Sequence, residues 1–277
     1  MKTCIACGGK ERAFFLKARD RLDPHAEYVY GRCTQCDLVT LEERTNNKNF
    51  QAYNLSANLS LPQKAVLTLF HRRLRKFKKS GRVLDFGAGA GNLAKYLSRK
   101  GYDLSCFEVD ENSATWLKNV QKLNVVDSSL GGQYDIIIME QVLEHLPDPA
   151  AILKKLKEHL ATGGILVISI PNINSLQARI FRANWFHLDA PRHLNHFYKK
   201  SFQSLLIQAN LSILKRYFFN LHIDPTGWLW SMNPSKRNRA LNTPWELLKL
   251  GLCLPLVIIT AAFRNTGYIL YIVTHGK

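Results

Sequence analysis

The most informative segment of this chain reads Arg82-Val83-Leu84-Asp85-Phe86-Gly87-Ala88-Gly89-Ala90-Gly91. Its apolar residues predict a short buried strand, which is followed at once by three alternating glycines. A helix is expected from about Asn92, because Leu93 and Leu97 fall on one helical face. Glycine lets the backbone turn sharply and lets a ligand approach it closely, and a helix N-terminus offers free N–H groups. The segment therefore predicts a ligand-binding loop at the end of a buried strand.

The loop departs from the two common phosphate-binding patterns. Asn92 stands near where the dinucleotide fingerprint needs its third glycine, and no Gly-Lys-Ser/Thr follows the loop. Asp85 ends the strand, and its carboxylate would repel a pyrophosphate. An amino group or a cationic cofactor suits this acid better.

Two further acids end predicted strands. Glu108 closes the segment 101–110, and Glu140 closes the segment 134–140. Strands are expected near residues 82–86, 103–108, 124–126, 134–139 and 164–170, with helices between them. This alternation predicts an α/β fold with a doubly wound parallel sheet. Ligands bind at the carboxyl edge of such sheets, so the acids are expected to gather there.

Four motifs in order carry a family resemblance. They are Asp-x-Gly-x-Gly-x-Gly at 85–91, the acid at 108, Val-Leu-Glu-His-Leu-Pro-Asp-Pro at 142–149, and Gly-Gly-x-Leu-x-Ile-x-x-Pro-Asn at 163–172. Together they resemble class I S-adenosylmethionine-dependent methyltransferases over about residues 61–277. The resemblance implies a Rossmann-like sheet of seven strands, of which the last, near 267–274, is antiparallel.

The resemblance also implies roles for individual residues. The three glycines would shape the methionine pocket, Asp85 would hold the amino group, and Glu108 would take the ribose hydroxyls. The cofactor-binding positions implied in this way are Asp85, Gly87, Gly89, Gly91, Glu108, Asp127, Glu140 and Gln141. Asp127 falls where the family contacts adenine, and the last two positions would flank the methyl-transfer site.

The N-terminal cysteines form a second pattern. Cys4-x-x-Cys7 and Cys33-x-x-Cys36 can together wrap one tetrahedral Zn²⁺ ion. With four protein ligands the site is closed, so we expect a structural zinc rather than a catalytic one. The chain is accordingly divided into a zinc-ribbon-like segment (1–45), a connector (46–61) and a methyltransferase-like domain (62–277) with a basic, apolar insertion at about 220–266.

The segment 185–197 packs histidines and an arginine among aromatic residues and is expected to border the acceptor. It looks like a segment of methyltransferases from cell-envelope polysaccharide clusters. A hydroxyl acceptor needs a base, and histidine suits neutral pH. The candidates are His193, then His145 and His196, with Arg192 binding an anionic acceptor group. The alternatives are a structural loop whose histidines bond the backbone, and for His145 a helix-start residue paired with Glu144.

The net charge of the chain and its apolar run near the C-terminus indicate which partners it could bind. The 38 basic and 21 acidic residues give a net charge of +17, which favours an anionic glycan, a lipid-linked or small-molecule acceptor, or an anionic membrane surface. The run 247–263 is apolar but contains Lys249 and Pro255, so buried or interfacial helices are expected rather than a crossing. Core packing and dimerisation are its other interpretations. The N-terminus lacks a signal-peptide run, so a cytoplasmic protein, peripheral at the inner membrane face, is expected.

The leading hypothesis is therefore a methyltransferase that acts on the oxygen of a glycan, lipid-linked or small-molecule acceptor. An RNA methyltransferase is an alternative that the charge permits, but no Asn/Asp-Pro-Pro-Tyr-type signature follows the segment 134–140. A non-catalytic cofactor-binding or scaffold protein at the membrane surface is the third hypothesis. The intact loop at 85–91 and Glu108 argue against it.

Overall fold

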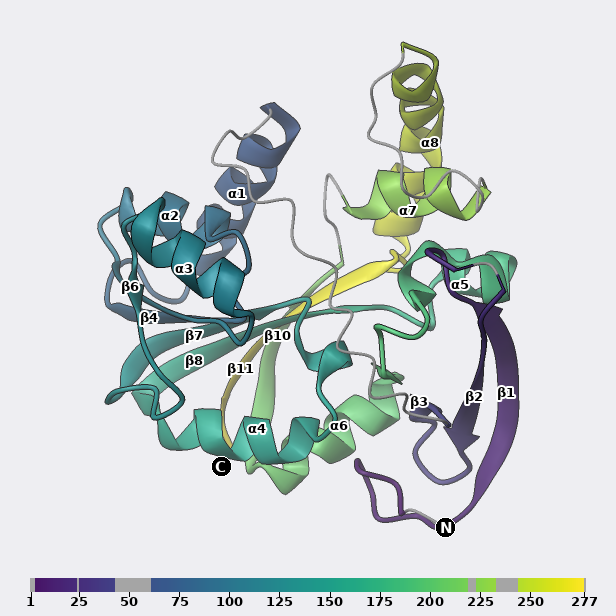
Figure 1. The fold of residues 1–277 in the computed structure, drawn as a ribbon, viewed down its shortest axis with the longest axis horizontal. Helices are drawn as coiled ribbons and strands as arrows, with labels where there is room; N and C mark the ends of the chain where they lie inside the picture. Colours follow the sequence, from purple (N-terminus) through teal and green to yellow (C-terminus); the bar gives the residue numbers. More distant parts are fainter. Residues whose placement is uncertain (1–2, 24, 43–60, 219–222, 233–243, 277) are drawn as a thin grey trace.

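The computed structural model describes the chain except for residues 1–2, 24, 43–60, 219–222, 233–243 and 277 (Figure 1). The expected connector at 46–61 lies outside the described residues apart from its last position. Two stretches of the expected insertion at 220–266 also lie outside them.

The core is a seven-stranded sheet in the order β10-β11-β8-β7-β4-β5-β6. Its strands are β4 (Arg82–Phe86), β5 (Asp103–Phe107), β6 (Asn124–Val125), β7 (Tyr134–Glu140), β8 (Leu160–Pro171), β10 (Leu211–Tyr217) and β11 (Tyr268–His275). Within the described part of the chain, β11 alone runs antiparallel to its neighbours in this sheet. The predicted Rossmann-like sheet with an antiparallel last strand is confirmed.

Helices cover both faces of the sheet (Figure 1). One face carries α1 (Leu61–Leu74), α2 (Asn92–Ser98) and α3 (Glu111–Asn119), and the other carries α4 (Pro149–Glu158) and α6 (Lys199–Gln208). Alternate residues of β7 serve the two layers: Ile136 and Ile138 belong to the apolar cluster of the first face, and Ile137 and Met139 to that of the second. A strand buried on both faces reads as a continuous apolar run, which is why these strands were visible in the sequence.

A second sheet joins the N-terminal segment to the rest of the chain. Its order is β1-β2-β3-β9, formed by β1 (Arg12–Arg19), β2 (Glu27–Cys33), β3 (Val39–Leu41) and β9 (Asn195–His196). The strand β9 lies inside the segment 185–197, so the predicted acceptor segment pairs directly with the cysteine-bearing segment. Apolar residues of both also share one cluster, in which Tyr30 and Val39 pack with Trp185 and Leu188.

The remaining helices lie beyond the carboxyl end of β8. They are η1 (Leu143–His145), α5 (Leu176–Phe181), η2 (Arg182–Asn184), η3 (Phe186–Leu188), α7 (Ile223–Met232) and α8 (Pro244–Ala262). The helix α8 projects from the body of the molecule (Figure 1), and its buried residues Cys253 and Val257 pack on tryptophans of α7. Among the described residues, no helix has the length and apolar character that crossing a membrane requires.

Candidate functional site

The glycine loop follows β4 in a backbone conformation that requires glycine. Gly87, Gly89 and Gly91 have φ values of 79°, 53° and 75°, all in the left-handed region. Space is also limited, because a Cβ on Gly87 would lie 2.6 Å from a methyl group of Val142, and one on Gly91 would lie 2.3 Å from Leu117. The loop is thus a tight turn that leads directly into α2.

Two of the strand-end acids, Asp85 and Glu140, lie in surroundings that disfavour negative charge. Burial raises the pKa of Asp85 to about 7, and the nearby Glu140 and Glu108 add to the shift. Burial likewise raises the pKa of Glu140 to about 7. Two acids with raised pKa values beside a glycine loop form a site that a cationic ligand would stabilise, because it would supply the missing positive charge.

Glu108 holds the loop in place. One of its carboxylate oxygens accepts a hydrogen bond from the backbone N–H of Gly89 at 2.7 Å. The other accepts from Val109 and Asp110 at 2.8 and 3.1 Å. The acid at the end of β5 therefore ties β5 to the glycine loop. The contact with the ribose that the resemblance implies for Glu108 stays a prediction.

Gln141 and Asp127 follow strands at the carboxyl edge of the sheet, and they differ in burial and in hydrogen bonding. Gln141 has a φ of 54°, and its side-chain nitrogen is buried with no hydrogen-bond partner among the described residues. Asp127 is exposed, and its carboxylate accepts from the backbone N–H and the hydroxyl of Ser129, which lower its pKa. Gln141 can therefore donate a hydrogen bond to a ligand, whereas the Asp127 carboxylate already accepts hydrogen bonds from Ser129.

These features fit S-adenosylmethionine, which carries a sulfonium and an ammonium group. Asp85 and Glu140 offer the negative charge, the glycine loop offers backbone close to the ligand, and the Gln141 amide offers a free donor. The structure brings Asp85, Glu108 and Glu140 together, while Asp127 lies at the end of β6, the outermost strand. The assignment of these residues to the cofactor stays a prediction.

The predicted catalytic histidines form one buried cluster. The rings of His145 and His193 meet edge to face with centroids 4.6 Å apart, and His196 lies 5.7 Å from His193. Each ring has a nitrogen within hydrogen-bond distance of a backbone carbonyl: Arg192 for His145, His187 for His193 and Leu188 for His196. The alternative that these histidines bond the backbone is thus realised, and a catalytic role for any of them stays a prediction.

Burial sets the protonation of these rings. It lowers the pKa of His145, lowers that of His193 well below its usual value, and lowers that of His196 to about 3. His196 is 1% exposed, whereas His145 is half-buried. All three are neutral at pH 7, and His145 has the best access to a ligand.

Glu144 is a buried acid that the sequence reasoning did not single out as a site residue. It is 0% exposed, and neither carboxylate oxygen has a hydrogen-bond partner in the described part of the chain. Burial raises its pKa to about 8. Ligand atoms of Glu144, His145 and His193 lie within 4.8 Å of one another, a spacing that would allow a divalent cation. The signal was present in the motif at 142–149, where an acid precedes a histidine.

Arg192 has a different role from the expected one. Its guanidinium donates to the carboxylates of Asp189 and Asp20 at 2.7 and 2.9 Å, and the side chain is 7% exposed. Arg21 contacts the same Asp189 oxygen at 2.8 Å. The expectation that Arg192 meets an anionic acceptor is therefore corrected: two acids, one of them from the N-terminal segment, already neutralise it.

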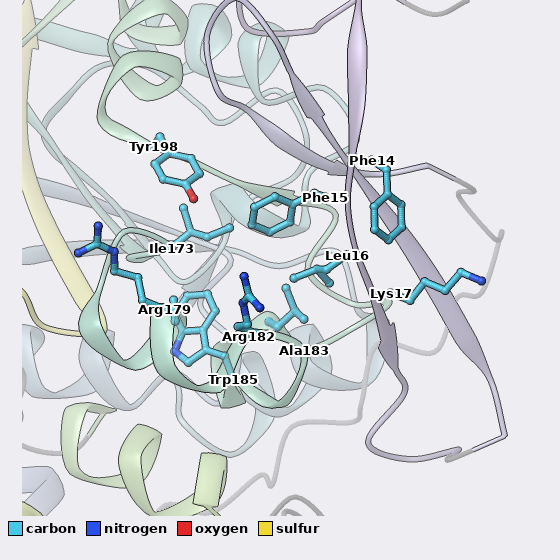
Figure 2. A pocket seen from close by; sticks show the side chains of 12 residues that line it. Phe14, Phe15, Leu16, Lys17, Ile173, Arg179, Arg182, Ala183, Trp185 and Tyr198 are labelled. Atoms are coloured by element: carbon cyan, nitrogen blue, oxygen red, sulfur yellow. The ribbon is translucent and has the colours of Figure 1, made fainter.

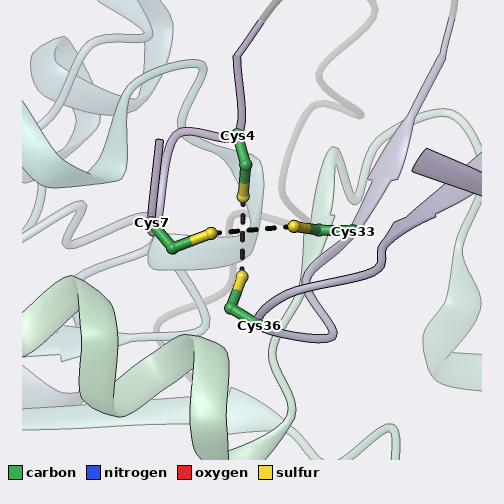
Figure 3. Close-up of side chains that lie close together, drawn as sticks. All are labelled: Cys4, Cys7, Cys33 and Cys36. Atoms are coloured by element: carbon green, nitrogen blue, oxygen red, sulfur yellow. Dashed lines mark hydrogen bonds between the residues drawn. The ribbon is translucent and has the colours of Figure 1, made fainter. Parts of the chain in front are cut away.

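The four N-terminal cysteines converge on one point (Figure 3). Their sulfur atoms all lie within 4.8 Å of one another, with Cys4–Cys36 at 3.5 Å and Cys7–Cys33 at 3.6 Å. A tetrahedron with Zn–S bonds of about 2.3 Å has sulfur atoms about 3.8 Å apart, so the geometry fits zinc. Each pair is closed by a left-handed residue, Gly8 and Asp37, directly after its second cysteine.

Comparison with known proteins gives three findings. A family model described as a methyltransferase domain matches residues 60–216, more than half of the chain. Ubiquinone biosynthesis O-methyltransferase from Psychrobacter arcticus is 30% identical over 119 residues, covering 38% of this chain and 46% of that protein. The enzyme of the same name from Cereibacter sphaeroides is 28% identical over 182 residues, covering 58% and 70%. The chain spans less than half the length of the first curated relatives it matches.

Solved structures resemble the fold. An S-adenosylmethionine-dependent methyltransferase from Archaeoglobus fulgidus has a TM-score of 0.51 at 18% identity, covering 76% of this chain and 93% of that one. Coclaurine N-methyltransferase, solved with N-methylheliamine and SAH, has a TM-score of 0.50 at 14% identity, covering 80% and 77%. At such identities the likeness concerns the fold alone.

Proposed function

The chain belongs to the methyltransferase domain family, and on this premise we propose that it is an S-adenosylmethionine-dependent O-methyltransferase. The observation that carries the proposal is the pair of acids Asp85 and Glu140, whose pKa values are both raised to about 7 beside a left-handed glycine loop. Such a site favours a cationic ligand. Oxygen as the methylated atom is supported by the name of the relatives, which are O-methyltransferases.

The acceptor we propose is an anionic glycan, lipid-linked molecule or small molecule of cell-envelope polysaccharide synthesis. The resemblance of the segment 185–197 supports this class. The net charge of +17 supports an anionic acceptor, because it raises the local concentration of anions around the protein.

When bound, the cofactor supplies an activated methyl group. The chain's own task is then to align the acceptor and to remove its proton. Alignment can supply about 7–11 kcal/mol of the barrier, and a positioned base adds roughly 10²–10⁴-fold in rate. We propose His145 as that base, with His193 as the second candidate, because His145 is neutral at pH 7 and less enclosed.

The decisive experiment is a calorimetric titration of S-adenosylhomocysteine into the protein and into Asp85→Asn and Glu108→Gln variants. Asp103→Asn is the matched control, because Asp103 begins β5 and its side chain is 75% exposed. We expect binding to the wild type and the control, and at least tenfold weaker binding to the two variants. Failure of well-folded wild-type protein to bind would refute the methyltransferase proposal and favour the scaffold alternative.

The proposed base is tested separately. His145→Gln should lower the turnover number about 10²-fold or more while leaving S-adenosylhomocysteine affinity unchanged. An equal loss in His193→Gln with little effect in His145→Gln would reverse the two assignments.

We also propose that Cys4, Cys7, Cys33 and Cys36 hold a structural zinc ion, on the strength of the sulfur spacing. Metal analysis of the purified protein should give one zinc per chain, and Cys36→Ser should reduce it. We further propose that the protein is cytoplasmic and meets an anionic membrane surface through α8, which exposes several large apolar residues.

A further inference from the structure

A cavity of about 620 Å³ lies between the edge strand β1 and the segment α5–η2. Ligand pockets typically have about 300–1,000 Å³, so it is large enough for a small organic molecule. The residues that line it are Phe14, Phe15, Leu16, Lys17, Ile173, Ala178, Arg179, Arg182, Ala183, Trp185, Leu188 and Tyr198 (Figure 2). The N-terminal segment and the larger domain both contribute, so neither forms this cavity alone.

A β-bulge shapes one wall. In the pairing of β1 with β2, Phe14 faces Gly31 and Leu16 faces Tyr30, so Phe15 is left without a partner. An extra residue re-aims the strand, and here Phe15 and Leu16, which are sequence neighbours, both line the cavity. An edge strand with a bulge beside a cavity is typical of a binding surface.

Trp185 forms the opposite wall. It is 1% exposed, and its indole N–H is buried without a hydrogen-bond partner among the described residues. Its ring packs on His196 with centroids 5.8 Å apart, which places the cavity one side chain away from the histidine cluster. The ring of Trp185 therefore gives the cavity an aromatic wall.

The charge of the lining is positive throughout. Lys17, Arg179 and Arg182 contribute three cations, and none of the lining residues is acidic. The Arg182 guanidinium lies between the rings of Phe15 and Trp185, while the charged ends of Lys17 and Arg179 point away from the centre (Figure 2). No carboxylate within the described ranges pairs with Arg182, in contrast to the neutralised Arg192.

The backbone of Arg182, whose guanidinium lies between Phe15 and Trp185 (Figure 2), is strained. Its φ and ψ are 47° and −115°, a conformation that non-glycine residues rarely adopt. Such strain costs about 1–3 kcal/mol and persists where the surrounding structure enforces it, often at ligand-binding sites. Here the strained residue is the one whose cation reaches the centre of the cavity.

We propose that this cavity binds a small amphipathic anion, with an apolar body against Phe15, Leu16 and Trp185 and a phosphate or carboxylate group at Arg182. An aromatic and aliphatic wall with one unpaired guanidinium matches that chemistry, since Arg binds carboxylate and phosphate oxygens through two parallel hydrogen bonds. The site is distinct from the glycine loop, and its test does not depend on methyl transfer.

The test is calorimetry with decyl phosphate below its micelle concentration, beside inorganic phosphate and the uncharged decyl maltoside. Four variants are compared with the wild type. Arg182→Gln removes the central cation, and Arg99→Gln is its control, at an exposed position directly after α2 and outside the cavity. Ala183→Trp fills the cavity, and Leu252→Gln alters the exposed apolar surface of α8.

We expect one site for decyl phosphate, at least tenfold tighter than for either of the other two probes. Arg182→Gln should weaken it at least tenfold and Ala183→Trp should abolish it, with Arg99→Gln and Leu252→Gln unchanged. Equal affinity for decyl maltoside, or binding that persists in Ala183→Trp, would overturn the proposal. If inorganic phosphate binds as tightly as decyl phosphate, the apolar part of the proposal is wrong. S-adenosylhomocysteine affinity, measured on the same samples, reports on the proposed function independently.

Discussion

The carboxyl of Asp85 is 3% exposed, and burial raises its pKa from 3.8 to about 7. An acid whose pKa is higher in the folded state binds its proton more tightly when folded. It therefore destabilises the fold once the pH exceeds the unfolded value, and the loss grows as the pH rises from about 4 through about 7. A binding site for a cation thus costs stability in the protein prepared without cofactor.

Asp85→Asn should remove that cost. We expect the free energy of unfolding to rise by about 1–3 kcal/mol at pH 8 and to change little at pH 4. Denaturant unfolding of cofactor-free protein at the two pH values measures both quantities. The exposed Asp103→Asn should behave like the wild type throughout. A loss of stability at pH 8 in Asp85→Asn would show that the carboxylate is stabilised by contacts that outweigh its burial.

Arg192 illustrates what a local sequence pattern does not contain. It stands among histidines and aromatics, which favoured an anion-binding role, but its partner Asp20 lies 172 residues away in the sequence. The glycines and strand-end acids were predictable because their roles depend on adjacent residues. The partner of a guanidinium depends on which distant segments meet, and the sequence spacing does not determine that.

A buried ion pair that loses one partner leaves an uncompensated charge. Arg192→Met should therefore lower the free energy of unfolding by about 3–5 kcal/mol, because Asp20 would lose its cation and Asp189 would keep only Arg21. Arg19→Met is the control: its pair with Glu27 is exposed, and the change should be about 1 kcal/mol or less. If Arg192→Met keeps its stability, these ion pairs do not stabilise the fold.

At the scale of elements, the segment 193–196, which includes the short strand β9, connects the cysteine-bearing segment to the candidate active site. The backbone N–H of Leu41, at the end of β3, donates to the carbonyl of Leu194 at 3.0 Å. The N–H of Leu194 in turn donates to the carbonyl of Glu144 at 2.9 Å, and the Tyr30 hydroxyl donates to the carbonyl of His193 at 2.8 Å. These hydrogen bonds link the cysteine-bearing segment to η1 and to the histidine cluster.

Loss of the fourth cysteine should loosen this connection. In Cys36→Ser we expect amide hydrogen exchange over residues 194–196 to quicken about tenfold or more, with S-adenosylhomocysteine affinity retained. Cys106→Ser is the matched control, because Cys106 is buried in the other core cluster. Exchange mass spectrometry gives the readout. Unchanged exchange at 194–196 would mean that the segment holds its shape without the cysteine site.

Comparison of the expected and observed strand boundaries shows which strands the periodicity of apolar residues can predict. The apolar strand β7 was placed almost to the residue, since burial on both faces leaves a continuous signal, whereas β8 begins at Leu160, four residues before the expected start. The two residues of β9 carry no periodicity at all and become a strand only because β3 lies beside them. The expected boundary at residue 45 therefore separates two segments, β1–β3 and β9, that share one sheet.

At the scale of the molecule, α8 is the part whose surface contrasts most with its surroundings. Its residues Leu248, Leu252 and Ile259 are 54%, 69% and 52% exposed, and their spacing puts them on one helical face. Lys249 lies within the helix, and Arg264 lies two residues after its last residue. Apolar patches of this kind on soluble domains mark interaction sites, and flanking cations favour an anionic lipid surface.

We expect the protein to sediment with vesicles that contain phosphatidylglycerol, and to do so less as salt screens the cations. Burial of one Leu or Ile side chain is worth about 1.5–3 kcal/mol, so Leu252→Gln combined with Ile259→Gln should reduce the bound fraction strongly. Ile207→Gln is the control, because Ile207 is 74% exposed on α6, on the opposite side of the molecule from α8 (Figure 1). Equal binding by all three proteins would place the membrane contact elsewhere. No binding by the wild type, together with a dimer that the double variant dissociates, would instead make α8 an interface between two copies of this chain.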